Sequence, residues 1–332
     1  MMNNEFSDAL GEDNEKQFHK LLQKTRRKTI LRNIIISVLC TFVILIGLMI
    51  VNRLLLSRSF DEAHSDISYY KQISDPNVSL GEFQSLDGFG SGTAEYKTYK
   101  VIEGIPLPWA EMKIHYNVLS QFSQFDGGYS PISIVDPDMV KQGMNFTRSY
   151  NVLNGQRELL FYHPEVKYTK MMNELSELSK MNAEKRVEMA ISFDKGYTLE
   201  EIRNMLPSGI HARWYWVDTY TPQYITFLGE TMLPISNNNV FGYAAYIDNE
   251  EYFENNEEKF ITYVKDGLAL KGNYHWQYQQ IFDKLRGNKT EPTKDQVHNI
   301  GVVVTGSAKT LNALQNKSYV RGAVLGAIVD KY

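Results

Sequence analysis

The stretch Thr25–Val51, TRRKTILRNIIISVLCTFVILIGLMIV, places a basic run against an apolar run, with neither Gly nor Pro where the two meet. From Ile34 to Val51 the chain carries no charge, and these residues form roughly 27 Å of helix. Continuing through Leu56 gives enough length to cross a hydrocarbon layer of ~30 Å with some tilt. A buried helix of a soluble domain is normally shorter or carries a polar stripe. The stretch therefore predicts a transmembrane helix over residues 33–56.

The charges on either side of this span predict its direction. Residues 16–32 hold seven Lys or Arg and no acid, whereas the far side offers only Arg53 and Arg58 nearby. Because cationic residues resist translocation, the amino end is expected in the cytoplasm and the carboxyl end outside. A cleaved signal peptide is the alternative, disfavoured by the long segment before the apolar run and by the lack of an A-x-A-like site after it. We therefore predict an uncleaved, single-pass anchor in the cell membrane.

Composition restricts the partners of the portion that follows the anchor. Its length of about 270 residues suffices for one large or two ordinary domains. Residues 1–32 carry a net charge of +2 and the whole chain −4, so residues 33–332 carry −6. No Lys/Arg-rich stripe occurs in this outer portion, which argues against nucleic acid as a direct partner. The single cysteine, Cys40, lies in the span, so the outer portion depends on neither disulfides nor a Cys-containing metal site.

The inner segment, residues 1–32, is too short for a core of its own. Its first fifteen residues are polar and acidic, and we predict that they are flexible or fold only against a partner. A helix is predicted from Asn14 into the span, because Phe18, Leu21 and Leu22 follow the three- and four-residue spacing of one face. Two interpretations of this apolar face remain open, namely docking into a protein partner and lying on the lipid surface.

Outside the membrane the chain is predicted to fold as an α+β region in two parts. Residues 57–182 are interpreted as a connector followed by a first outer region. Alternating apolar residues predict strands at 94–102 and 111–118, and helical spacing predicts a helix at 168–181.

The second part, residues 183–332, shows a clearer pattern of strand, helix and strand, which occurs twice. The predicted elements are 186–193, 199–206 and 212–220, and then 298–305, 308–314 and 320–329. Two β-α-β segments in one domain indicate an α+β sandwich, with a strand order that the sequence leaves open.

The aromatic strand of this domain has two interpretations. Alternation places Trp214, Trp216, Asp218 and Tyr220 on one face. Core packing is favoured, because aromatic residues are enriched in strands and dominate cores. The alternative is an exposed platform of Trp214, Trp216 and Tyr220 that binds a cell-wall glycan or a peptide.

The sequence contains no pattern typical of an enzyme. GVVVTGSAKT (Gly301–Thr310) is similar to a P-loop, but two residues stand between Gly306 and Lys309, so the backbone nest and the ammonium cannot converge on one phosphate. The seven histidines lack the H-x-H or H-E-x-x-H spacing of metal sites, and no G-x-S-x-G elbow occurs. We therefore expect no catalytic residue, no metal and no cofactor.

Two stretches together resemble a known family. FHKLLQKTRRKTILRNIIIS (Phe18–Ser37) is similar to the amino-terminal signature of the membrane-anchored sigma factor regulators of Gram-positive bacteria. Residues 186–222, which begin RVEMAISFDKGY, and residues 301–332 resemble the carboxyl-terminal domain of the same family. The resemblance covers most of the chain, and the order of the parts agrees.

The resemblance implies an anti-sigma factor. The inner segment would sequester an extracytoplasmic-function sigma factor, and the domain over residues 183–332 would govern its release after an envelope signal, with an accessory membrane protein as a further partner. Phe18, Leu21 and Leu22 are the candidate sigma-binding residues, by their spacing. The zinc-containing class, with its H-x3-C-x2-C motif, is excluded by the residues near the start of the chain. The alternative function is a membrane-anchored outer protein that binds a cell-wall ligand or peptide and has no sigma partner.

Overall fold

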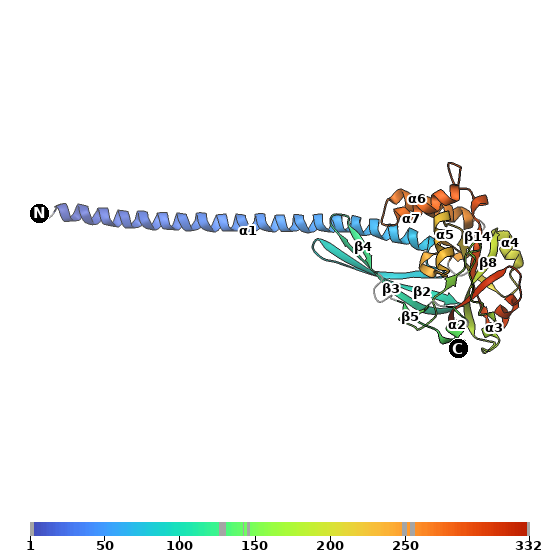
Figure 1. Ribbon diagram of the computed structural model, residues 1–332. Coiled ribbons are helices and arrows are strands. Elements are labelled where there is room, and N and C mark those ends of the chain that lie inside the picture. The colour runs from blue at the N-terminus through green and yellow to red at the C-terminus, as the bar shows by residue number, and fades with distance from the viewer. Residues whose placement is uncertain are drawn as a thin grey trace.

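The computed structural model begins with one very long helix. It describes residues 3–125, 131–141, 143–144, 147–247, 251–252 and 256–330. The helix α1 (Asn3–Ile73) contains 71 residues, which at the helical rise give a rod roughly 107 Å long. Figure 1 shows the amino-terminal part of α1 projecting away from a mixed body of helices and strands, and its carboxyl-terminal part lying against that body. The predicted fold class, an apolar amino-terminal helix followed by an α+β region, is confirmed.

The bounds of α1 correct two expectations. Residues 3–13 are helical, where we predicted a segment that is flexible or folds only against a partner. The helix also does not end after the span but continues to Ile73, in place of the expected connector. No proline occurs within α1, and Pro76 follows shortly after its last residue, as is common beyond helix ends. From the last residue of the span onward, Leu56, Ala63 and Ile67 form a buried stripe at helical spacing, so packing rather than propensity explains the continuation.

The first outer sheet packs against the last third of α1. Its antiparallel strands follow the chain order, β1 (Ser79–Asp87), β2 (Ser91–Ile102), β3 (Ile105–Asn117) and β4 (Phe122–Phe125). The predicted strands at 94–102 and 111–118 fall on β2 and β3. The shared core of α1 and this sheet consists of Leu56, Ala63, Ile67, Ala94, Tyr96, Met112, Ile114 and Tyr116.

The carboxyl-terminal sheet has the order β11-β9-β14-β8-β15, and all neighbours are antiparallel. Its strands are β8 (Arg186–Tyr197), β9 (His211–Val217), β11 (Gly242–Ala244), β14 (Asn299–Ser307) and β15 (Val320–Val329). The predicted β-α-β segments are β8-α4-β9 and β14-α8-β15, with the helices α4 (Leu199–Met205) and α8 (Ala308–Leu311). Each is split by an antiparallel strand, β14 in the first and β8 in the second. This is the connectivity of the ferredoxin-like β-α-β-β-α-β pattern, with a long insertion between β9 and β14.

Further helices and strands complete the body. The remaining helices are α2 (Pro137–Lys141), α3 (Leu175–Leu178), α5 (Pro222–Thr231), α6 (Asn256–Leu270) and α7 (His275–Arg286). The remaining strands are β5 (Ile132–Ile134), β6 (Arg148–Tyr150), β7 (Leu160–Phe161), β10 (Ile235–Ser236), β12 (Tyr246–Ile247) and β13 (Glu251–Tyr252).

The helix predicted over residues 168–181 is wrong except for the single turn α3. The backbone of Met172 hydrogen-bonds with Ala323 of β15, and its N–H also donates to the hydroxyl of Tyr162 at 3.1 Å. Most of this segment therefore lies extended beside the sheet despite its helical spacing of apolar residues, because contacts with the sheet override its helical preference.

Candidate functional site

The inner end of α1 carries an apolar face that the body does not cover. The side chains of Phe18, Leu21 and Leu22 are 62, 62 and 50 % exposed, and at about 100° per residue they lie on one side of the helix. Thr25 continues the same side, and its hydroxyl donates to the carbonyl of Leu21 at 2.9 Å. We call these four residues the inner face. The three predicted sigma-binding residues thus lie together, and their role remains a prediction.

Basic residues border the inner face and occupy the back of the helix. By helical spacing, Arg26 and Lys28 flank the apolar side, and Lys20, Lys24 and Arg27 lie opposite to it. All five are exposed. This end of α1 is therefore a cationic amphipathic helix.

The middle of α1 is apolar around its whole circumference. Side chains such as Phe42, Leu45 and Met49 are 63, 52 and 68 % exposed, and the hydroxyl of Thr41 is satisfied by the carbonyl of Ser37 at 2.9 Å. Over Gln17–Ile73, where the structure describes its side chains, this helix is long and apolar enough to cross a membrane. Such a surface is stable when lipid surrounds it, since all backbone groups are paired within the helix.

The outer end of α1 is fixed to the connection between α6 and α7. The ring of Tyr70 stacks on that of Tyr274, with centroids 3.6 Å apart and planes 7° from parallel. Asp66, which is 1 % exposed, accepts the backbone N–H of Asn273 at 2.9 Å. Burial raises the pKa of the Asp66 carboxyl, although the bond from Asn273 opposes this.

A buried ion pair joins the first outer sheet to the carboxyl-terminal sheet. The ammonium of Lys100 on β2 lies 2.9 and 3.1 Å from the two carboxylate oxygens of Glu188 on β8, and both side chains are almost fully buried. The amide of Asn77, four residues beyond α1, donates to Glu188 Oε1 at 2.7 Å, and the N–H of Ala327 on β15 donates to Oε2 at 3.2 Å. The Lys100 ammonium also lies 3.9 Å from the ring centroid of Trp109. We call these five residues the junction.

A second link lies at the turn between β2 and β3. Glu103 in that turn accepts the hydroxyl of Thr305 on β14 at 2.7 Å, and it lies 2.9 Å from Nδ1 of His211 on β9. The end of the β2–β3 hairpin is therefore held by polar contacts to β8, β9 and β14. A shift of one sheet against the other would break these contacts together. It would also leave the buried charges of Lys100 and Glu188 without their partners, which costs free energy.

The junction was not found by our sequence reasoning, because its members lie 88 and 111 residues apart in the chain. Two signals were present. Glu188 interrupts the apolar strand RVEMAISF, and Lys100 occupies an inward position in the alternation of β2. A charge at a core position indicates a buried partner.

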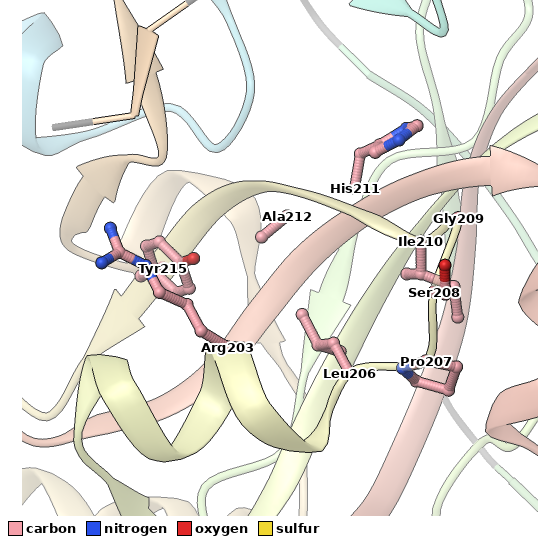
Figure 2. Close-up of a pocket in the computed structure, with 9 residues that line it drawn as sticks. All are labelled: Arg203, Leu206, Pro207, Ser208, Gly209, Ile210, His211, Ala212 and Tyr215. Carbon is pink, nitrogen blue, oxygen red and sulfur yellow. The ribbon is translucent and has the colours of Figure 1, made fainter.

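A pocket of about 470 Å³ lies where α4 leads into β9 (Figure 2). Figure 2 shows Arg203 and Tyr215 toward one end and Pro207 and Ser208 toward the other. In its lining, Nδ1 of His211 lies 2.9 Å from the Glu103 carboxylate. In the part of the chain that the structure describes, no group of three or more His, Cys, Asp or Glu is placed to hold a metal ion.

The aromatic strand is part of the core. Trp214, Trp216 and Tyr220 are 2, 0 and 6 % exposed. The indole N–H of Trp216 donates to the hydroxyl of Tyr220 at 3.1 Å, and the ring of Phe161 lies 5.1 Å from that of Trp216. The alternative of an exposed aromatic platform is therefore wrong. Both faces of this sheet are covered by other elements, so the three rings have no exposed surface on which a ligand could bind.

Comparison with known families gives two matches. The family described as Sigma factor regulator N-terminal matches residues 19–106, and the one described as Sigma factor regulator C-terminal matches residues 178–327. The first match begins in the inner face and ends beyond β2, and the second includes the split β-α-β units. No curated protein and no solved structure matches the chain.

The two matches occur in the order that the sequence predicted and together cover most of the chain. The protein therefore belongs to the sigma factor regulator family. This family is regulatory rather than enzymatic, and it implies a sigma factor as partner and an anti-sigma role for the chain.

Proposed function

We propose that the protein sequesters an extracytoplasmic-function sigma factor at the inner surface of the cell membrane and releases it after an envelope signal. In this proposal residues 1–32 lie in the cytoplasm, residues 33–56 cross the membrane, and residues 57–182 and 183–332 form the outer body. The observation that carries the proposal is the uncovered inner face, which lies on the same helix whose other end is built into the body.

Sequestration uses the inner face as a helix that docks into a groove of the sigma factor. Anchors at spacings of three and four residues are typical of this mode of recognition. Phe18, Leu21 and Leu22 supply such anchors, and the flanking Arg26 and Lys28 favour an acidic rim on the partner. Burying each exposed apolar side chain contributes about 1.5–3 kcal/mol before the costs of association.

Release uses the continuity of α1. One unbroken helix runs from the inner face to Ile73, and Asn77 then connects the chain to Glu188 in the carboxyl-terminal sheet. A ligand or an accessory membrane protein that shifts the two outer sheets against each other moves the end of this rod. The junction is therefore our candidate for the element that passes an outer signal to α1.

The proposal is tested by capture of sigma factors on the full chain. The intact protein is co-expressed with the extracytoplasmic-function sigma factors of its host and purified from membranes. Leu21→Asp places a charge in the inner face and is expected to abolish capture. Gln23→Asp introduces the same charge on the far side of the helix and is expected to retain it. Equal capture by both variants, or none by the unaltered chain, would contradict the proposal.

The alternative, an anchored protein that binds an outer ligand and has no sigma partner, is favoured by the pocket beside α4. The same experiment separates the two functions. An unaltered chain that captures no sigma factor but binds cell-wall fragments or peptides through this pocket would support the alternative.

A further inference from the structure

Two hairpin turns of the first outer sheet lie beside the outer end of the span. The amide of Asn52 donates to the carbonyl of Gly88 at 3.0 Å and accepts the N–H of Gly90 at 2.7 Å. The carbonyl of Gly90 in turn accepts the N–H of Val118 at 3.0 Å. The β1–β2 turn and the β3–β4 turn are thus tied to each other and to α1, and Figure 1 shows these hairpins running back along the helix toward its amino end.

The position of Asn52 defines the level of these turns relative to the membrane. Asn52 follows directly on Val51, the last residue of the uncharged run. Leu54 and Leu55, which come next, are 66 and 41 % exposed, whereas Leu56 is fully buried in the body. At ~1.5 Å per residue, the turns therefore lie within about one helical turn of the point where the hydrocarbon ends.

The turns present bare apolar side chains at this level. Leu86, Phe89 and Leu119 are 79, 76 and 73 % exposed. They are more exposed than any large apolar side chain of the span, where the largest value is 69 % at Val43. Three such groups on adjacent turns are an apolar patch of the kind that marks a membrane or protein contact.

Local hydrogen bonds hold both turns in shape. The carboxylate of Asp87 accepts the hydroxyl of Tyr116, and the N–H of Leu119 donates to the side-chain oxygen of Asn117 at 2.9 Å. Asp87 is the sole charged residue in 83–91, and residues 117–125 carry none. The apolar groups are thus presented on ordered turns, so little conformational entropy is lost when they enter an apolar medium.

We propose that these two turns insert Leu86, Phe89 and Leu119 into the outer leaflet of the membrane that α1 spans. The inference rests on the proposed crossing of residues 33–56. Lipid is the occupant that continuity favours, because the patch adjoins a helix surface that needs lipid on every side. The outer body is then seated on the bilayer at three points, the helix and the two turns, rather than held at a distance on a tether.

The experiment uses the full chain with Cys40→Ala and one new cysteine, labelled with the fluorophore NBD. The protein is reconstituted in vesicles of phosphatidylcholine and phosphatidylglycerol, with a doxyl quencher at a shallow position of the lipid. Phe89→Cys and Leu119→Cys are expected to show blue-shifted emission and loss of fluorescence to the quencher. Leu153→Cys, an exposed leucine (52 %) in a loop tied to Pro108 at the other end of the sheet, is the matched control and is expected to show neither.

Two outcomes overturn the inference. If the labels at positions 89 and 119 behave like the one at 153, the turns do not enter lipid and face a protein partner or solvent instead. A label at Leu45→Cys separates this failure from a failure of the anchor. If a mid-chain doxyl lipid quenches the label at position 45, residues 33–56 do cross the membrane and only the insertion of the turns is refuted. If it does not quench that label, the proposed membrane crossing is refuted as well. Sigma capture by the same preparations tests the proposed function independently.

Discussion

The two ends of α1 carry similar apolar residues in opposite surroundings. On the inner and middle parts they are exposed, as at Leu21 (62 %) and Leu54 (66 %), whereas from Leu56 onward the face toward the body is buried, with Ala63 at 0 % and Ile67 at 1 %. Among the side chains that the structure describes on α1, from residue 17 onward, the body thus packs against the outer end alone. The rest of the helix needs lipid or a second protein, and this difference separates changes that affect stability from changes that affect binding.

The largest effect on the buried side is expected from Trp216→Ala. Removing a fully buried indole costs about 3–5 kcal/mol of unfolding free energy, because it leaves a cavity in the core and removes the bond to Tyr220. Denaturant unfolding of the full chain in detergent measures the loss. Trp276→Ala is the control, since this indole is 65 % exposed and its removal is expected to change stability by less than about 0.5 kcal/mol. Equal losses in the two variants would contradict the assignment of Trp216 to the core.

The junction gives the next effect. Glu188→Gln leaves the buried Lys100 ammonium without its counter-charge and is expected to cost about 3 kcal/mol. In the double variant Lys100→Met/Glu188→Gln no buried charge remains and the amide oxygen at position 188 can still accept from Asn77, so most of the stability is expected to return. A single variant as stable as the unaltered protein, measured by the same unfolding experiment, would show that this pair does not join the sheets.

A smaller effect of opposite sign is expected from Asp66→Asn. Since burial raises the pKa of this carboxyl, the folded state binds a proton more readily than the unfolded state, and stability falls as pH rises between the unfolded and the folded pKa. Asparagine keeps an acceptor for the N–H of Asn273 without the buried charge. The variant is expected to be more stable by about 1 kcal/mol above this window, and the gain is expected to shrink as pH falls through it. Unfolding midpoints across pH check this, and a variant that is less stable at every pH would refute it.

An effect of similar size, but destabilising, is expected at the start of α4. The hydroxyl of Thr198 accepts the N–H of Glu201 at 3.3 Å, and the Glu201 carboxylate accepts the N–H of Thr198 at 2.8 Å. Thr198→Ala removes this cap and is expected to cost about 1 kcal/mol, with sigma capture unchanged. Thr226→Ala, on the exposed side of α5, serves as the control within a helix. A loss of capture by Thr198→Ala at full stability would place α4 in the binding function.

Features that depend on one segment were predictable from the sequence. The length of the uncharged run predicted the apolar helix, and alternation predicted β2 and β3. The repeated pattern of strand, helix and strand predicted β8, β9, β14 and β15 with α4 and α8. The inner face could be proposed because three apolar residues fall on one side of a helix whatever surrounds them. The family matches then agree with the resemblance of the two ends of the chain.

Features that depend on contacts between distant segments were not predictable. Helical spacing relates Phe60, Ala63 and Ile67, but the residues between them are mostly polar, so the pattern was not recognised. The sheet that buries these three residues lies further along the chain. The splitting of β8-α4-β9 by β14 requires pairing across about a hundred residues, which leaves no local trace in the sequence. For the same reason the junction and the contact of Asn52 with the β1–β2 turn emerge from the structure alone.

The central claim is that one helix crosses the membrane, with a sigma-binding face at its cytoplasmic end and the body at its outer end. Its most direct test is labelling of intact cells with a membrane-impermeant maleimide, in chains with Cys40→Ala and either Lys20→Cys or Lys317→Cys, both at exposed positions. The account predicts that the cysteine at 317 reacts in intact cells and the one at 20 only after permeabilisation. Labelling at position 20 in intact cells, or a mature chain that lacks this position, would contradict it.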